Sequence, residues 1–390
     1  MKVLIISNGF PGYGGQATTA YNLHLFLESK NLDTKLLLLN SKKLPESKSF
    51  KEFKNSHNLN FLYWFLIRYE NTLILIKAKI LKLTISKLLF LRLFLNFIGL
   101  KIRHYMISQT IKSNIIKYKD NHYDLVITNS PLLYSEINKL FEKTLLIIGS
   151  SLPVHISHNK EFTEHQVFEN LGHLKIKLSK KIVNNLNKAH IIFNSKLTQS
   201  IYEFCGVKPV NRNFLFFNFA PFLMKKDKAF IDRKFDIAFV VSNFDRKIKN
   251  PELTYKLFKK FPQLKKVAIG RRSNYFSEIS NTIAMDLMTQ KELAKILSET
   301  KLLIIPSHFD SSPSLMAESV LNGCNILLSK NVGWNETMDE RCIVQNFQNH
   351  NEWVSKIEYL INNEVENNEF LDIINNSKQE IYSLIDSLTK

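Results

Sequence analysis

The stretch PSHFDSSPSLMAESVLNG, residues 306–323, decides the fold of the second half of the chain. It follows the apolar run at 302–305, which is typical of a buried strand. Ser312 is the expected N-cap of a helix with Pro313 at its first position, and Gly323 is the expected C-terminal stop. The stretch therefore predicts a strand end, a loop and a helix start in one place, and such a helix start favours an anion such as a diphosphate.

Two carboxylates flank this helix start. Asp310 lies in the loop, and Glu318 lies inside the expected helix. Both can reach into one pocket as acceptors for sugar or ribose hydroxyls. A capped helix with two solvent-facing acids explains the same pattern, so geometry alone leaves both interpretations open.

The remainder of the second half alternates strands with helices. Asn250 followed by Pro251 predicts one helix start, and Thr289 with Glu292 forms a capping box at another. Apolar runs predict strands at 236–241, 266–269, 302–305, 326–329 and 342–344. This alternation is typical of a doubly wound α/β sheet.

The first half shows the same alternation. Apolar runs predict strands at 3–6, 36–39, 123–128, 144–148 and 189–193. Gly14 and Gly15 lie in the loop after the first of these strands, and a helical pattern follows. A glycine pair allows close backbone approach to a ligand because it lacks Cβ atoms, although such pairs also occur in loops without that role.

The segment at about 60–118 is both apolar and basic, and its helical pattern is an insert in the first half. At 100° per residue its cations scatter around the helix axis and do not form one face. Two interpretations stay open: core helices with snorkelling basic side chains, or a monotopic membrane contact. The cations in question are Lys77, Lys79, Lys82, Lys87, Arg92, Lys101 and Arg103.

Composition limits the class of protein. The 390 residues suffice for about two domains, and the formal charge of +18 favours anionic partners: nucleotide phosphates, acidic lipid or nucleic acid. No recognised nucleic-acid module is evident, which makes nucleic acid the weaker choice. The longest uncharged apolar stretch, 93–100, is shorter than the ~20 residues of a membrane span. Three dispersed cysteines and no signal-peptide core lead us to expect a cytoplasmic protein.

The 306–323 stretch resembles the donor-site signature of the retaining GT-B glycosyltransferases of family 4. The similarity lies in Asp310-x7-Glu318, followed by Gly323 and NILLSKNVGWNE. In that family two glutamates hold this spacing, the first contacting the transferred sugar and the second the nucleotide ribose. This chain has an aspartate at the first position, one methylene shorter.

A second similarity is SNFDRKIKNPEL, residues 242–253, which resembles the family segment G-R-L-x-x-x-K-N. The family's Arg and Lys bind the donor diphosphate and stabilise the leaving group. Lys249 matches the Lys, whereas Asn243 occupies the Arg position and Arg246 is expected to supply the guanidinium. Cations suit this position because the departing diphosphate gains charge in the transition state. A solvated basic helix start is the ordinary alternative.

The family also carries a His at the end of a first-domain strand, near the reacting carbon. Gly149 occupies that position here, while His155 and His158 follow shortly after. His155 is kept as a catalytic candidate, with a surface or structural role as the alternative. We predict no metal site, because D-x-D is absent and the two histidines lack a third nearby ligand.

The resemblance implies a GT-B fold, in which two Rossmann-like domains face each other across a cleft. Residues 1–222 would form the acceptor-side domain, 223–233 the linker and 234–365 the nucleotide-sugar donor domain, with a helix at 366–390 crossing back. The donor phosphates would lie between the Gly14 and Gly15 loop, the two cations, and the helix start. The residues expected at that helix start are Ser312, Ser314 and Leu315.

The function implied is retaining, metal-independent sugar transfer to a glycan or lipid-linked acceptor, in surface polysaccharide or glycoconjugate synthesis. The nucleotide sugar is a substrate, and no cofactor is expected. The protein would be cytoplasmic, with peripheral contact to the inner membrane face as an option. Two alternatives stay open: a GT-B-type nucleotide-sugar epimerase, and a catalytically weak membrane-binding protein that retains the fold.

Overall fold

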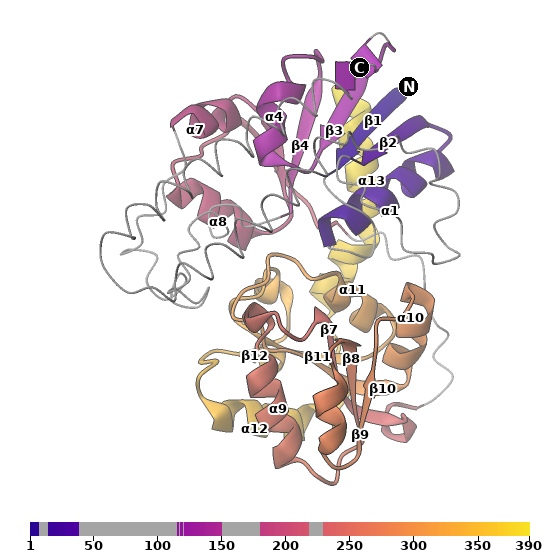
Figure 1. Ribbon diagram of the computed structural model, residues 1–390, viewed down its shortest axis with the longest axis vertical. Coiled ribbons are helices and arrows are strands. Elements are labelled where there is room, and N and C mark those ends of the chain that lie inside the picture. The colour runs from indigo at the N-terminus through magenta and orange to yellow at the C-terminus, as the bar shows by residue number, and fades with distance from the viewer. Residues whose placement is uncertain (8–14, 39–114, 117, 120, 150–179, 218–228) are drawn as a thin grey trace, which may run out of the picture.

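The computed structural model describes the chain except for residues 8–14, 39–114, 117, 120, 150–179 and 218–228. Gly14, His155, His158 and nearly all of the 60–118 insert therefore lie outside the described residues. The described residues form two separate sheets of parallel strands, one in each half of the molecule along its long axis (Figure 1). Each sheet has helices on both faces. The predicted α/β class with two facing Rossmann-like domains is confirmed.

The first sheet has six parallel strands in the order β2-β1-β3-β4-β5-β6. All five predicted strands are confirmed, and the short polar edge strand β6 was missed. The strands are β1 (Lys2–Ser7), β2 (Asp33–Leu38), β3 (Leu125–Thr128), β4 (Thr144–Ile148), β5 (His190–Phe193) and β6 (Asn211–Phe214).

Both faces of this sheet are covered, which explains why its inner strands, β1, β3, β4 and β5, are largely continuous apolar runs. Side chains alternate between the faces: Val3 and Ile5 belong to one buried cluster, Leu4 and Ile6 to another. The covering helices are α1 (Gly15–Ser29), α4 (Pro131–Ile137), α7 (Lys180–Asn187) and α8 (Lys196–Phe204).

The second sheet also has six parallel strands, in the order β12-β11-β10-β7-β8-β9. Its predicted strands are confirmed except that Cys342 belongs to a 3-10 helix and not to a strand. The edge strand β9 was missed. The strands are β7 (Phe235–Asn243), β8 (Lys266–Arg271), β9 (Thr282–Met285), β10 (Thr300–Ile305), β11 (Asn325–Ser329) and β12 (Ile343–Val344).

Helix caps agree with most of the predicted starts. Asn250 accepts a hydrogen bond from the Leu253 amide, and the capping box of Thr289 and Glu292 is complete. Ser312 is not an N-cap, since Pro313 holds that position. The helices are α9 (Pro251–Lys260), α10 (Gln290–Ser298), α11 (Ser314–Leu321), α12 (His350–Leu360) and α13 (Asn368–Thr389). Short 3-10 helices occupy Phe230–Asp232, Lys247–Lys249, Asn274–Glu278, Asn335–Thr337 and Glu340–Cys342.

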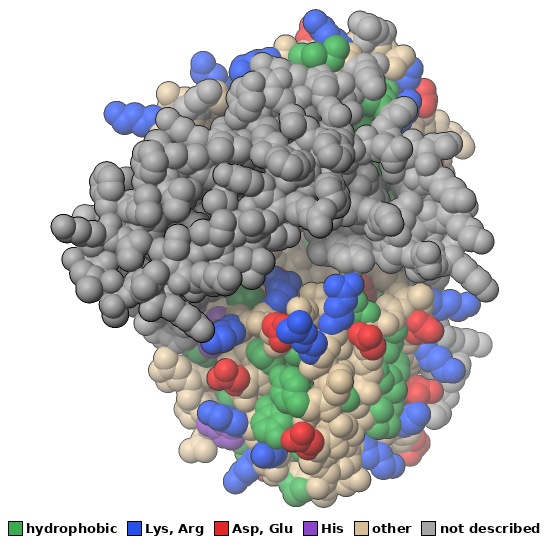
Figure 2. Space-filling model, viewed as in Figure 1, with side chains coloured by type: hydrophobic (Ala, Val, Ile, Leu, Met, Phe, Trp, Pro, Cys, Tyr) green, Lys and Arg blue, Asp and Glu red, His purple; other side chains and the backbone are tan. Residues whose placement is uncertain are grey.

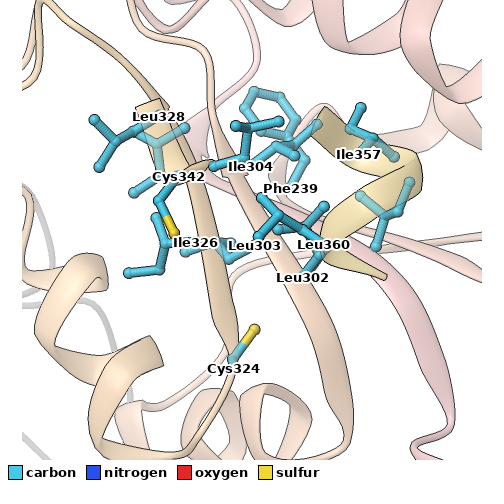
Figure 3. Close-up of a cluster of buried hydrophobic side chains, with 14 of the residues drawn as sticks. Phe239, Leu302, Leu303, Ile304, Cys324, Ile326, Leu328, Cys342, Ile357 and Leu360 are labelled. Carbon is cyan, nitrogen blue, oxygen red and sulfur yellow. The ribbon is translucent and has the colours of Figure 1, made fainter. Parts of the chain in front are cut away.

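The core of the second half lies between the β10 and β11 strands and the helices that cover them. Figure 3 shows Leu303 and Ile304 beside Phe239 of β7, with Ile357 and Leu360 of α12 close by. Gly323 follows the C-cap of α11 with φ 72°, so the predicted glycine stop is confirmed.

Helix α13 connects the two halves. Its first turns place Phe370 and Ile374 in the core of the second half. Its last turns place Ile381 and Ile385 in the core of the first half, against strands β1 and β3. Figure 1 shows this helix running from one half to the other. Twenty-two residues of helix extend about 33 Å, which is enough to pack on both.

Candidate functional site

The carboxyl ends of the two sheets meet each other. Ser311, after β10, donates its hydroxyl to the Gly149 carbonyl after β4 over 3.1 Å. Trp334, after β11, donates its indole N–H to the Asn194 carbonyl after β5 over 2.6 Å. In open α/β sheets ligands bind outside the carboxyl ends of the strands, where the strand order reverses. Each sheet of this protein brings such an edge to the junction.

In the second sheet the strand order reverses between β7 and β10, because the chain runs outward through β8 and β9 and then returns to the other side of β7. The loops after these two strands are joined, since the His308 amide donates to the Ile248 carbonyl over 2.8 Å. Figure 2 shows several Lys and Arg side chains along the border of the second half that faces the first.

Lys249 and Asp310 form an ion pair at this reversal point. Their side chains are 16% and 15% exposed, so water screens the pair only in part. The Asp310 backbone is held from the other side: its amide donates to the Asn331 carbonyl over 3.2 Å, and its carbonyl accepts from the Gly333 amide over 2.8 Å. The structure thus brings together two predicted site residues from distant segments.

Arg246 lies on the same turn as Lys249, as the N-cap of the 3-10 helix Lys247–Lys249, and its side chain is exposed. Asn243 closes that turn: its side chain accepts from the Asp245 amide over 3.0 Å, and its carbonyl accepts from the Arg246 amide over 3.2 Å. At the neighbouring strand end, after β8, Arg272 pairs with Asp245, and sequence reasoning did not single out this cation.

Glu318 lies in the second turn of α11, and only 8% of it is exposed. Burial raises the pKa of this carboxyl to about 7, while a hydrogen bond with Ser314 acts in the opposite direction. Since Ser314 is the first residue of α11, that bond directs the carboxyl toward the helix N-terminus, the end that follows the loop containing Asp310. Ser312 and Leu315 are half-buried at the same helix start.

The glycine and histidine candidates are not placed against these residues. Gly15 is the first residue of α1, and Gly14 and His155 lie outside the described residues. In the part of the chain that is described, no group of three or more His, Cys, Asp or Glu side chains could hold a metal ion. No described helix meets the length and hydropathy needed to span a membrane.

The first sheet adds buried polar residues that sequence reasoning missed. Its strand order reverses between β1 and β3, and there the Asn129 amide group donates to the Ser7 hydroxyl over 2.9 Å. Asn194 and Ser195 are also buried, directly after β5. The signal was available in the sequence, because an Asn-Ser pair follows both VIT at 126–128 and IIF at 191–193.

No protein-family model matches the chain, and no curated protein matches its sequence. Solved structures do match its fold. TarM aligns with a TM-score of 0.61 and 11% identity, over 100% of this chain and 98% of TarM. The lipopolysaccharide outer core galactosyltransferase WaaB aligns with a TM-score of 0.58 and 13% identity, over 99% of both chains.

A third structure, described as trehalose-6-phosphate from E. coli bound with UDP-2-fluoro glucose, aligns with a TM-score of 0.57 and 11% identity. It covers 100% of this chain and 99% of its own. At such identities the likeness concerns the fold. The chain therefore has the two-domain α/β fold of the GT-B glycosyltransferases.

Proposed function

We propose that this protein is a retaining glycosyltransferase that moves a sugar from a nucleotide-sugar donor to a glycan or lipid-linked acceptor. The observation that carries the proposal is the meeting of Lys249 and Asp310 at the reversal point of the second sheet. The cation and the helix N-terminus there suit a diphosphate, and the carboxylate suits sugar hydroxyls.

The diphosphate is assigned to the cationic part. Lys249 and Arg246 lie on one turn after β7, and the N-terminus of α11 contributes the positive end of its dipole. Such groups favour the transition state because the bond to the leaving diphosphate breaks and negative charge accumulates on its oxygens. No metal ion or cofactor is required in this proposal, since the charge is met by side chains and backbone N–H groups.

The two carboxyl groups are assigned to hydroxyls. Asp310 would accept from the sugar, and Glu318 from the ribose, which suits its place one turn inside α11. Burial raises the pKa of this carboxyl to about 7, so it is ionised in part at neutral pH. Its oxygens can accept hydrogen bonds from the hydroxyls of a diol in either state.

The remaining details rest on resemblance. Retention of anomeric configuration is proposed because the segments at Asp310 to Glu318 and at Lys249 resemble the motifs of family 4. WaaB is a lipopolysaccharide galactosyltransferase by its description, which supports a glycan acceptor in surface polysaccharide synthesis. The formal charge of +18 supports action at the cytoplasmic face of an anionic membrane.

The first test is a thermal-shift screen of the purified protein against UDP-, GDP-, TDP- and CMP-sugars. A ligand at 100 times its Kd stabilises the folded state by about 2.7 kcal/mol, so the correct donor should raise the Tm clearly. Glu318→Ala should bind that donor less tightly by about 1.5 to 3 kcal/mol. A protein stabilised by none of the four classes, or a Glu318→Ala variant with wild-type affinity, would speak against the proposal.

The second test identifies the reaction. With the donor found, NMR of the products would show an α- or β-linked glycoside of the same configuration as the donor. Formation of an epimer or a glycal without any acceptor would favour the epimerase alternative.

A further inference from the structure

We infer that Trp334 is a positioning residue, which clasps the Asp310 loop to the first domain and so holds Asp310 beside Lys249. The value of holding Asp310 in this place rests on the function proposed above, whereas the contacts of Trp334 do not depend on it. The clasp itself is defined by contacts that cross between the two halves. We use the name Asp310 loop for residues 306–313, which follow β10.

Trp334 adopts a backbone conformation that is unusual for a bulky residue. Its φ is 72°, in the left-handed region that side chains with a Cβ rarely occupy. Such conformations persist where the surroundings over-determine them, and they gather at functional positions. The side chain is almost fully buried, with 4% exposed. Its contacts must therefore account for the conformation.

Those contacts lead across the junction. The Trp334 indole N–H donates to the Asn194 carbonyl, at the end of β5 in the first half, over 2.6 Å. The ring also packs edge-on against Phe216, which follows β6, with 5.4 Å between the centroids. Asn194 is a firm anchor because its side chain accepts from the Thr198 hydroxyl in α8 over 2.8 Å.

The neighbouring glycine brings the three segments together. A Cβ at Gly333 would lie 1.9 Å from the Ser311 carbonyl oxygen and 2.8 Å from the Ser195 hydroxyl oxygen. Only glycine permits this approach, because any side chain would push the Asp310 loop and the first half apart. The Gly333 amide also donates to the Asp310 carbonyl over 2.8 Å, which links Trp334 to Asp310 through one residue, its chain neighbour Gly333.

A second bond closes the clasp. Ser311 donates to the Gly149 carbonyl over 3.1 Å, and the Asn194 side-chain amide approaches the Ser311 hydroxyl at 3.5 Å. Ser311, the residue next to Asp310, is thereby fixed to the ends of β4 and β5 in the first half. Loss of the Trp334 bond should loosen the Asp310 loop and the α8 start together.

The other tryptophan of the second half supplies a matched control. Trp353 is fully buried and donates its indole N–H to the Phe347 carbonyl over 3.0 Å, within one half. Trp334→Phe and Trp353→Phe remove the same kind of bond and keep an aromatic ring. Hydrogen exchange of the full-length protein then shows where each loss is felt.

Trp334→Phe should raise exchange about tenfold in peptides covering 190–204 and 306–316, as expected for one buried hydrogen bond. Trp353→Phe should leave 190–204 unchanged and raise exchange near 345–357. Equal exchange at 190–204 in wild type and Trp334→Phe would overturn the clasp. If Trp334→Phe fails to fold, Ser311→Ala tests the same peptides by removing only the second bond, and unchanged exchange there would overturn it as well.

Titration with UDP-glucose separates the clasp from the proposed function. If the wild type binds this probe, Trp334→Phe should raise the Kd about tenfold and Trp353→Phe less than about twofold. Equal Kd values in the two variants would remove the positioning role. A wild type that ignores UDP-glucose would count against that donor alone, while the exchange result would still decide the clasp.

Discussion

The ammonium group of Lys249 and the carboxylate of Asp310 form an ion pair that joins the turn after β7 to the loop after β10. A second pair, Lys301 with Asp236 at 2.8 Å, joins the same two strands at their amino ends. Both pairs are similarly buried, with exposures of 13% to 17%. The Lys249–Asp310 pair lies at the carboxyl ends of the strands, where we propose that the donor binds, and the Lys301–Asp236 pair lies at their amino ends. The two pairs therefore provide a test and its control.

We predict that Lys249→Ala and Asp310→Ala each lower kcat/KM for sugar transfer by about 100-fold or more, because in the proposed site both groups would face the reacting end of the donor. Asp310→Glu should keep more activity than Asp310→Ala, since it keeps the carboxylate. Steady-state kinetics per folded enzyme give the comparison. Asp236→Ala should lower the free energy of unfolding and leave kcat/KM within about threefold. Equal activity of Asp310→Glu and Asp310→Ala would remove Asp310 from the site.

Arg246 is predicted to contribute to the leaving-group charge although its side chain is exposed in the free protein. Arg246→Ala should reduce kcat by about tenfold or more, whereas Lys259→Ala, an exposed cation in α9, should not. Single-turnover rates at saturating donor would show the difference. A neutral Arg246→Ala beside a damaging Asn243→Ala would mean that Asn243 holds the functional position.

Glu318 should make stability depend on pH. Its folded-state pKa of about 7 lies above the ordinary value of 4.5, so the folded state binds more protons than the unfolded state between these values. The free energy of unfolding should therefore fall as pH rises from about 4.5 to 7, by up to about 3 kcal/mol. Glu318→Gln removes this dependence, and relative to wild type it should be more stable at pH 8 than at pH 5.

Urea unfolding at both pH values measures that effect. Glu358→Gln, at an exposed position of α12, is the control and should change stability equally at pH 5 and pH 8. If Glu318→Gln also changed the free energy of unfolding equally at pH 5 and pH 8, the carboxyl of Glu318 would titrate in the ordinary range.

Residues 73–103 are predicted to hold the enzyme at an anionic membrane surface. They contain seven basic side chains and no acidic one, with long apolar stretches. Attraction of about 1 kcal/mol per basic residue would add to apolar burial. Co-sedimentation with anionic liposomes at low salt should be strong, weaken with salt, and weaken further with Gln at Lys77, Lys79, Lys82 and Lys87. A folded wild type that stays in the supernatant at low salt would exclude this role.

The sequence by itself determined the alternation of strands and helices in both halves and most of the strands. Central strands such as β3, β4 and β10 are buried on both faces, so each appears as an uninterrupted apolar run. The strands it missed, β6 and β9, both lie at sheet edges. β6 and β9 carry polar or half-exposed residues and are paired on one side only, so their strand character comes from the neighbouring strand. The other two edge strands, β2 and β12, contain short apolar runs and were predicted from them.

The candidate site divides in the same way. Helix-start chemistry and the spacing of Asp310 and Glu318 are local, and the sequence indicates them directly. The contact of Lys249 with Asp310 depends on β10 lying beside β7, and the clasp of Trp334 on Asn194 depends on how two sheets meet. The raised pKa of Glu318 likewise arises from burial. All three features arise where segments that are distant in the sequence pack together, so only the tertiary structure decides them. No local sequence pattern encodes which strands are neighbours or which strand ends of the two sheets face each other.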